Sequence, residues 1–482
     1  METKKEYKKF LCHVKSENSK YGIQKYLKDN ISMIEKINQK KQIILTITDD
    51  KPHTITTQKR KENNKFLFDF EIQKDLSNQH GKLFDMSYSD NNLLFIAKDS
   101  MITTSGYDEQ TFLPKYQIQC NNIIYGEKST FYRMILPIEK SLNLVMAFYH
   151  WNQYSCDTYS SCSGLLKFFV NGDTFHIFQY NDKYLIIDST SQLDYQKFYD
   201  ICVTALVSLG IITGYFVQKE CYIISSDKED FKSIKYIEYK SLRESKKSNY
   251  RVLPLSPYDY FNPEEAEQKR SYIIPVHSSK LTKLINSMLN SEVLLNALFI
   301  LVESFDYPLD THPACLSVVL EGICNYIENG NLELFTPINE KSQAKKLKKA
   351  MKDILKNYSD YFSKDGEKIL IKRIDNINSE TNSGRFKKCI DILGIKLTDY
   401  EEETLINRNT FLHGDVELKD ECMLLKAHSS DFFKFFFAEQ ILLRLLYKMI
   451  LKIMDYDGYM VNFPKYQNEF ENLKNEDLLI RI

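Results

Sequence analysis

The hydrophobic periodicity of the chain changes near its middle, and this change restricts the possible folds more than any other feature. In the first part, short runs rich in β-branched and aromatic residues, such as QIILTITDD and NNLLFIAKDSM, are separated by Asn, Asp, Gly and Ser, which is typical of strands and turns. After Ser278, apolar residues recur at helical spacing. The sequence therefore predicts an α+β fold. A β-rich N-terminal domain with a short helical segment covers residues 1–250, and an all-helical bundle covers residues 278–482.

The segment between these parts, residues 251–277, contains Pro254, Pro257 and Pro263. Proline fixes φ and removes a backbone donor, so we expect a linker here. The chain of 482 residues is also too long for one ordinary hydrophobic core, which agrees with two or three domains. In the N-terminal domain we expect a mostly antiparallel sheet, arranged as a sandwich or an open barrel.

Two local signals in the N-terminal domain predict specific elements. Asn171-Gly172-Asp173 separates two apolar runs, as the turn of a β-hairpin would. Further on, apolar residues at helical spacing predict a helix that Gly210 and Gly214 end.

In the C-terminal half we expect a bundle of five to seven helices. The segments SEVLLNALFILVES and ACLSVVLEGICNYIE are apolar on most faces, so they should be inner helices. A later helix is predicted over Asp399–His413. It begins with the capping-box pattern Thr398-x-x-Glu401 and ends at Gly414.

Composition predicts a soluble protein in a reducing, cytoplasmic compartment. Apolar residues make up 43% and charged residues 27% of the chain, and its ten cysteines include no CxxC pair. The first twenty residues lack the apolar core of a signal peptide. The most apolar late segment, Phe432–Met454, contains a charged residue every four or five positions, which predicts a soluble helix with one exposed charged stripe.

The stretch from Lys341 to Lys388 is strongly basic. It contains 14 Lys and Arg against six Asp and Glu, an excess of eight positive charges within a chain whose net charge is −1. Such a stretch suits a polyanion, because neutralised phosphates release counterions. We therefore take four of its lysines as candidate RNA contacts, with a solvated helix face as the equal alternative: Lys345, Lys346, Lys348 and Lys349.

An arginine, an asparagine and a histidine stand close together in LINRNTFLHGD, residues 405–415. A guanidinium binds a phosphate through two hydrogen bonds, an imidazole moves protons near neutral pH, and an amide can orient either group. Cleavage of RNA by its own 2′-OH needs these groups. Arg408 and His413 lie about 140° apart around a helix, however. Spacing alone favours a surface ion pair of Arg408 with Glu401–Glu403 and a helix cap by His413.

The segment RNTFLHG resembles the R-x(4–6)-H motif of HEPN domains (higher eukaryotes and prokaryotes nucleotide-binding), placed in a C-terminal helical bundle. A β-rich region followed by such a bundle resembles the ApeA-type HEPN proteins of bacterial anti-phage defence. The resemblance implies a metal-independent endoribonuclease, with tRNA among its candidate substrates, whose homodimer joins two motifs in one cleft. It also implies that Arg408 holds the scissile phosphate, that His413 is the acid/base and that Asn409 orients one of them.

Two acidic residues in apolar helical segments, Glu303 and Glu321, are candidate supports, since a salt bridge to Arg408 would relieve the cost of burying either carboxylate. An ordinary structural pair is the alternative for both. We expect no metal, no cofactor and no membrane partner, and we expect the N-terminal domain to sense a phage component or restrain the nuclease. The alternative function is a catalytically inactive bundle that binds RNA or a protein as an adaptor.

Overall fold

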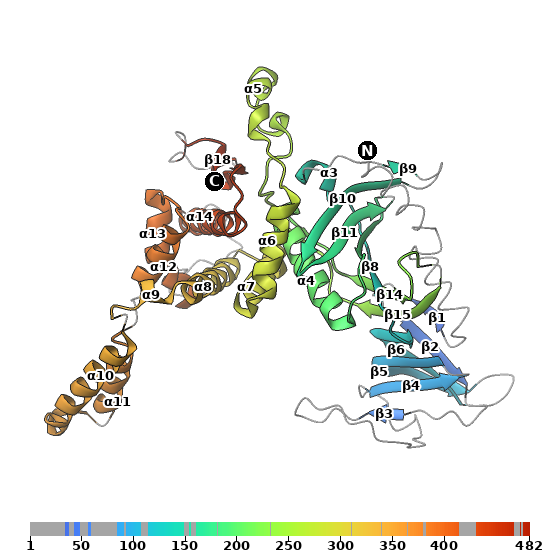
Figure 1. Cartoon of the computed structure of the whole chain (residues 1–482), viewed down its shortest axis with the longest axis horizontal. Helices are drawn as coiled ribbons and strands as arrows, with labels where there is room; N and C mark the ends of the chain where they lie inside the picture. Colours follow the sequence, from blue (N-terminus) through green and yellow to red (C-terminus); the bar gives the residue numbers. More distant parts are fainter. Residues whose placement is uncertain are drawn as a thin grey trace. The chain divides into compact units, whose positions relative to one another are not determined.

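The computed structural model divides into two compact units (Figure 1). Unit 1 comprises Met1–Asn249 and Pro275–Asn286, and unit 2 comprises Tyr250–Ile274 and Ser287–Ile482. The residues that the structure describes are 34–37, 43–48, 56–58, 84–90, 93–107, 114–148, 154–155, 161–180, 182–231, 233–309, 311–338, 340–363, 365–378, 382–413, 430–466, 473 and 476–482.

Unit 1 is built on one antiparallel sheet of 14 strands. Its order is β1-β2-β6-β5-β7-β15-β14-β8-β12-β11-β10-β9, with β4 also paired to β5 and β3 to β4. The strands are β1 (Ile34–Ile37), β2 (Ile43–Thr48), β3 (Thr56–Gln58), β4 (Phe84–Asp90), β5 (Leu93–Tyr107), β6 (Pro114–Cys120), β7 (Asn122–Gly126), β8 (Phe131–Pro137), β9 (Tyr154–Ser155), β10 (Ser161–Val170), β11 (Asp173–Tyr180), β12 (Tyr184–Ser189), β14 (Glu220–Ser226) and β15 (Ile234–Ser241). A sheet region followed by a helical region confirms the predicted α+β class.

The sheet is continuous because of β5. The first part of this strand pairs with β4 and, through Phe95–Lys98, with β7. Its second part, Met101–Tyr107, pairs with β6. One long strand thus joins two sets of neighbours into a single hydrogen-bonded sheet, and the expected sandwich or barrel arrangement stays a prediction. Strand periodicity fixes which side chains share a face, but it does not fix how many strands one sheet contains.

The predicted hairpin turn is confirmed. Val170 of β10 pairs with Asp173 of β11, so Asn171 and Gly172 form a two-residue loop. Both residues have positive φ, 50° and 87°, which is the backbone that Asn-Gly favours in tight hairpins.

Helix α4 (Tyr195–Thr213) is the predicted helix of unit 1. Asp194 caps its start by accepting from the backbone N–H of Gln196 at 2.8 Å, and Gly214 ends it with φ 67°. The sequence predicted that Gly210 would also end the helix. The structure shows that the helix runs past Gly210 to Thr213. The helix continues because Ile211 and Ile212 are buried, which outweighs the cost of about 1 kcal/mol for glycine inside a helix.

Helix α4 packs against the sheet. The ring of Phe198 stacks on Tyr132 of β8 with 5.3 Å between centroids. Among the described residues, α4 alone is long and apolar enough by itself to cross a bilayer, and most of it is buried. Its burial is that of a core helix. The rest of unit 1 includes the short helix α3 (Leu144–Ala147) and the strand pair β13 (Tyr215–Phe216) and β16 (Lys246–Lys247). Residues of α6 (Ser278–Leu289) up to Asn286 also belong to this unit.

Unit 2 is mainly helical. Its elements are η3 (Pro257–Asp259), α5 (Pro263–Gln268), η4 (Arg270–Tyr272), α7 (Glu292–Glu303), η5 (Ser304–Asp306), α8 (His312–Gly330), α9 (Leu332–Phe335), α10 (Lys341–Lys356), η6 (Ser359–Tyr361), α11 (Gly366–Asp375), α12 (Asn382–Ile392), α13 (Asp399–His413), α14 (Ser430–Ile453), β17 (Tyr459–Val461), α15 (Phe463–Tyr466) and β18 (Leu479–Arg481). Helices α7, α8, α13 and α14 pack together. Gly322 of α8 allows a close approach to α7, because a Cβ there would lie 2.5 Å from that of Ala297.

The proline-rich segment packs on the C-terminal part of unit 2. Val461 donates its N–H to the carbonyl of Val252 at 2.9 Å, and the Tyr456 hydroxyl donates to the carbonyl of Ile274 at 2.7 Å. Tyr272 stacks on Tyr459 with 4.2 Å between ring centroids. Residues 250–274 are therefore an ordered part of this unit.

Candidate functional site

The predicted catalytic motif lies on α13. This helix spans Asp399–His413, the bounds that the capping pattern predicted. Arg408 and Asn409 therefore lie between one and two turns before the end of the helix, and His413 is its last residue. The side chains of these three residues lie outside the described residues, as does Gly414, so their roles stay predictions.

The start of α13 is held by the predicted capping box. The Thr398 hydroxyl accepts from the backbone N–H of Glu401 at 3.3 Å, and the Glu401 carboxylate accepts from the N–H of Thr398 at 2.9 Å. Two backbone donors that the helix cannot satisfy itself are thus paired.

Glu401 also belongs to a buried ionic network, here called the Arg444 cluster. The Arg444 guanidinium donates to Glu401 at 3.0 Å and to Glu476 at 2.6 Å. Lys448 donates to Glu401 at 2.6 Å. The guanidinium also donates to Asn462 at 3.0 Å and to the Thr398 hydroxyl at 3.1 Å. The cluster thus ties the first turn of α13 to α14 and to the C-terminal end of the chain.

The charges of the Arg444 cluster balance. Arg444 and Lys448 carry two positive charges, and Glu401 and Glu476 carry two negative ones. Burial alone raises the pKa of Glu401, but Arg444 and Lys448 outweigh it and lower that pKa below its ordinary value. Burial lowers the pKa of Lys448, with Glu401 acting against it. Since Arg444 and Glu401 are fully buried, removal of one partner would leave an uncompensated charge inside unit 2.

The cluster corrects a prediction about α14. The charged residues of Phe432–Met454 were expected to form one exposed stripe. Glu439, Arg444 and Lys448 are instead all buried, because each has a partner of suitable chemistry on another element. These three side chains face a paired interior, whereas Lys452 of the same helix is partly exposed.

Glu439 pairs with a histidine. The Nδ1 atom of His312, at the start of α8, lies 2.6 Å from the Glu439 carboxylate, and Gln440 donates to the other carboxylate oxygen and to the hydroxyl of Tyr250. The Nε2 atom of His312 is buried without a hydrogen-bond partner. The sequence offered only the presence of a charge at Glu439 as a signal for this pair.

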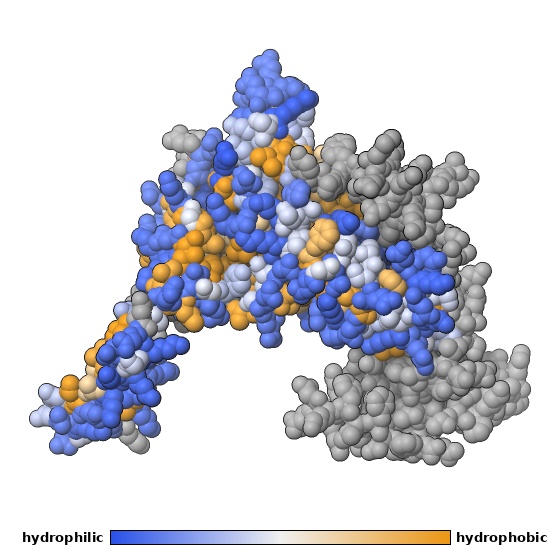
Figure 2. Space-filling view, in the orientation of Figure 1, coloured by the Kyte–Doolittle hydropathy of each residue, from blue (hydrophilic) through white to orange (hydrophobic). Residues whose placement is uncertain are grey.

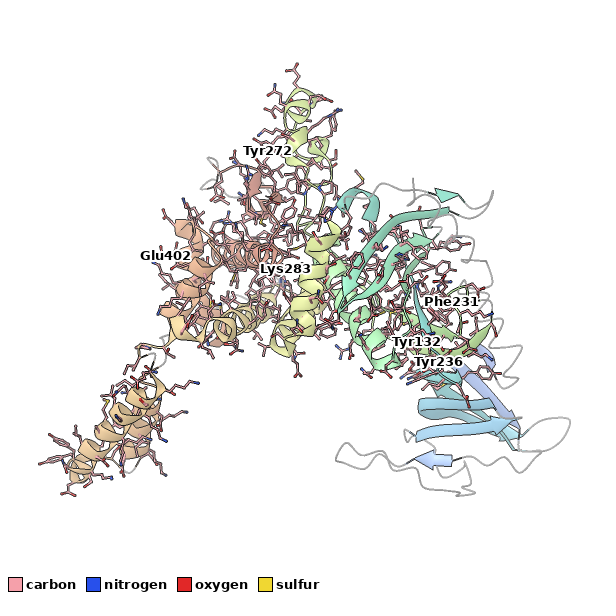
Figure 3. All side chains as sticks on the ribbon, in the orientation of Figure 1. Tyr132, Phe231, Tyr236, Tyr272, Lys283 and Glu402 are labelled. Carbon is pink, nitrogen blue, oxygen red and sulfur yellow. The ribbon has the colours of Figure 1, made fainter. Side chains whose placement is uncertain are left out.

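The two candidate support residues differ in burial. Glu303, the last residue of α7, is buried as predicted, whereas Glu321 on α8 is partly exposed. Whether either carboxylate pairs with Arg408 stays a prediction, because the side chain of Arg408 lies outside the described residues. Glu401 is engaged by Arg444 and Lys448 and is fully buried, so it takes no part in a surface ion pair. Glu402 (Figure 3) pairs with Lys387 of α12 at 3.3 Å.

The four candidate lysines lie on α10. Lys345, Lys346 and Lys349 are exposed. Lys348 is partly buried, and its ammonium donates to the backbone carbonyl of Asp375 on α11 at 2.5 Å. The structure thus separates one lysine that holds the helix pair together from three that face solvent.

Unit 1 contains two further polar groupings. In the first, the buried Glu238 carboxylate accepts from the hydroxyls of Tyr195 and Tyr236 and forms an ion pair with Lys240, which joins α4 to β15. Burial and the neighbouring Glu238 raise the pKa of both tyrosines. Figure 3 labels Tyr236 and, close by in the view, Tyr132. Each group has a partner, so the grouping acts as a structural tie.

The second grouping runs across the sheet. Arg133 of β8 donates two hydrogen bonds to Asp188 of β12, at 2.6 and 2.7 Å, and both residues are fully buried. The guanidinium lies 4.4 Å from the centroid of the Phe231 ring. His176 of β11 is the cross-strand partner of Asp188. Burial, and to a smaller extent the charge of Lys167, lowers the pKa of His176 to about 4, so this imidazole is neutral at pH 7.

Among the described residues, no group of three or more His, Cys, Asp and Glu side chains is placed to hold a metal ion. No family model matches the chain, and no curated protein and no solved structure matches it. The described arrangement is therefore a helix with a rigidly held first turn, whose last two turns carry the Arg408, Asn409 and His413 motif.

Proposed function

We propose that this protein is a HEPN-type endoribonuclease that cleaves RNA without a metal ion. The observation that carries the proposal is the position of the motif on α13. Arg408, Asn409 and His413 occupy the end of a helix whose start is fixed by a capping box and by the Arg444 cluster. A fixed helix is what a catalytic group needs, because misplacement by about 1 Å can lower a rate by about a hundredfold.

The proposed reaction needs only groups of this motif. The ribose 2′-oxygen attacks the adjacent phosphorus as an imidazole takes its proton, and the bond from phosphorus to the 5′-oxygen breaks. The leaving oxygen then receives a proton from an imidazolium of the motif. The guanidinium of Arg408 balances the negative charge that builds on the phosphoryl oxygens. The products are a 2′,3′-cyclic phosphate and a 5′-hydroxyl.

The angle between Arg408 and His413 supports a homodimer. Side chains about 140° apart on one helix cannot both face one phosphate easily. In a two-fold symmetric dimer, two copies of the motif can face one cleft, so the partner supplies what one helix cannot. If light scattering finds only monomer at micromolar concentration, both with and without the activator, the proposal of a cleft shared by two copies is wrong.

We further propose that the enzyme acts in the bacterial cytoplasm in abortive-infection defence, with unit 1 as the sensor of a phage protein and RNA contacts made by Lys345, Lys346, Lys348 and Lys349. Support comes from the order of the two regions along the chain, a sheet region followed by the motif-bearing helices. The adaptor alternative differs in one respect, since it needs RNA or protein binding but no reaction at His413.

The test is RNA cleavage in EDTA. Purified protein is incubated with total tRNA and with other cellular RNA, beside Arg408→Ala and His413→Ala. Arg270→Ala and His277→Ala serve as matched controls, because both residues are exposed and distant in sequence from the motif. We expect products ending in cyclic phosphate from the wild type and both controls, and none from the motif variants. Equal activity of His413→Ala, or cleavage only with added Mg²⁺, contradicts the proposal.

A further inference from the structure

Helices α10 and α11 form a hairpin whose surface is only weakly buried. The two helices pack against each other and project as a pair (Figure 1). Within them only Ala344 and Ile374 are buried. Ile354 and Ile369 are 58% and 52% exposed, and orange residues are visible among the blue ones of this hairpin in Figure 2. The hairpin therefore keeps most of its side chains available to a partner.

One face of α10 carries a straight line of lysines, here called the lysine line. Its members are spaced three or four residues apart, which keeps them within about 40° of one direction around the helix. From the first to the last lysine the helix rises about 22 Å, close to the length of six stacked nucleotides at about 3.4 Å each. The lysine line consists of Lys341, Lys345, Lys349, Lys352 and Lys356.

The charge of the lysine line is only partly neutralised. Lys352 pairs with Asp375 at 2.6 Å, and Lys356 pairs with Asp353 at 2.8 Å. Among the ion pairs between described residues, none involves the first three members of the line. The uncompensated positive charge is therefore concentrated in the first half of α10, where a polyanion would gain most.

Three apolar residues of α10 lie on the side opposite the lysine line. Leu347, Met351 and Ile354 each follow a member of the lysine line by two residues, about 200° further around the helix. A lysine-rich face opposite an apolar face is also the pattern of a helix that lies on an anionic membrane. A nucleic-acid strand needs only the lysine face, so anionic vesicles are the competing ligand in the test.

An aromatic side chain stands beyond the end of the line. Tyr361, at the end of η6, is 85% exposed. An exposed ring near a row of lysines is a feature of proteins that bind single strands, because unpaired bases stack on aromatic rings while the lysines neutralise phosphates. A duplex offers phosphates but keeps its bases stacked inside.

We infer that the hairpin is a binding arm for single-stranded RNA, in which the lysine line follows the sugar-phosphate backbone and Tyr361 stacks on a base. The inference rests on the proposed function for the choice of RNA over DNA. It also revises the set of contacting lysines. Lys346 points about 100° away from Lys345, and Lys348 is bonded to the backbone of α11, so neither belongs to the phosphate path.

The test measures binding by fluorescence anisotropy with the full chain carrying His413→Ala, which keeps the probe intact. The probes are a fluorescein-labelled oligouridylate of twelve nucleotides, the same length of oligothymidylate and a twelve-base-pair RNA duplex. Lys345→Ala/Lys349→Ala should weaken oligouridylate binding about tenfold near 0.15 M salt, and it should reduce the slope of log K against log salt by roughly 0.7 per lysine. Lys396→Ala, which removes an exposed lysine outside α10, is the matched control and should stay within about twofold.

Tyr361→Ala should weaken oligouridylate binding about tenfold without changing the salt slope, and Tyr361→Phe should restore it, since stacking needs the ring and not the hydroxyl. Unchanged affinity and slope in the double lysine variant overturn the inference. Equal affinities for the duplex and the single strand, with no effect of Tyr361→Ala, overturn the inference that the arm prefers single-stranded RNA. Binding of anionic lipid vesicles that depends on the lysine line, without RNA binding, assigns the arm to membranes and also overturns it.

Failure of the arm and failure of the proposed nuclease can be told apart. If oligouridylate binds as expected but Arg408 and His413 have no effect on RNA cleavage, the arm stands and the nuclease does not. If cleavage depends on those two residues while the lysine variants bind normally, the reverse holds. Tighter binding of oligothymidylate than of oligouridylate would assign the arm to DNA and overturn the choice of RNA.

Discussion

Replacement of Arg444 by methionine should destabilise unit 2 strongly. Methionine keeps much of the aliphatic volume but removes the guanidinium, which makes hydrogen bonds of 2.6 to 3.1 Å to four partners. Loss of one member of a buried ion pair costs about 3–5 kcal/mol, mostly because the partner charge stays buried. Here Glu401 keeps its contact with Lys448 at 2.6 Å, and Glu476 is 25% exposed, so we expect the lower end, about 3 kcal/mol.

For a domain of this size, about 1 kcal/mol corresponds to roughly 2–4 °C in the melting temperature. Arg444→Met should therefore lower the calorimetric transition of unit 2 by roughly 6–12 °C. Because a two-unit chain need not unfold in one step, hydrogen exchange of peptides from α13 and α14 should be followed as well. These peptides should exchange faster, whereas peptides from α4 should not change.

The matched control is Arg270→Met. Arg270 pairs with Glu267 at 2.8 Å on the surface, where both side chains are more than half exposed, so its loss should cost less than about 1 kcal/mol. Adding Glu476→Gln to Arg444→Met should recover part of the loss, because Glu476 loses the cation it pairs with when Arg444 is replaced, whereas Glu401 keeps Lys448. An Arg444→Met variant as stable as the control would refute the idea that this cluster holds the start of α13.

Three further predictions concern single positions. Gly126→Ala should destabilise unit 1 by about 2 kcal/mol or more, about twice the effect of Gly172→Ala. Both glycines have positive φ, but only at Gly126 would a Cβ meet a backbone oxygen, that of Lys235, at 2.1 Å. Equal melting temperatures of the two variants would contradict this prediction. Burial lowers the pKa of His176 to about 4, so the unfolded chain binds more protons than the folded chain between about pH 6.5 and 4. The free energy of unfolding of unit 1 should therefore fall as pH falls through this window. In His176→Asn, the free energy of unfolding measured by urea titration should depend less on pH over the same window. Arg444 and Lys448 lower the pKa of Glu401 against the effect of burial. The stabilisation that the Glu401 carboxylate gives to unit 2 is therefore complete above the ordinary carboxyl pKa of 4.5 and is lost as pH falls below that value. If hydrogen exchange of α13 in Glu401→Gln depends on acid as it does in the wild type, the stabilising role of this carboxylate is wrong.

Local interactions explain what the sequence could predict. The hairpin at Asn171-Gly172 and the start of α13 at Thr398-x-x-Glu401 are each decided by residues within three or four positions of one another. The bounds of α13, and with them the helical setting of Arg408, Asn409 and His413, followed from such signals. Local composition also predicted the basic stretch that begins at Lys341, the first residue of α10.

Only the tertiary structure decided which charges are buried. Arg444 and Glu401 are 43 positions apart, and Glu439 and His312 are 127 apart, so no pattern within one helix shows that these groups meet. A charged residue enters a protein interior only when a partner from another element compensates it. The sequence by itself therefore determined the elements and the composition of the motif. The contacts between elements determined that α14 buries Glu439, Arg444 and Lys448 and that the motif helix is fixed at its first turn.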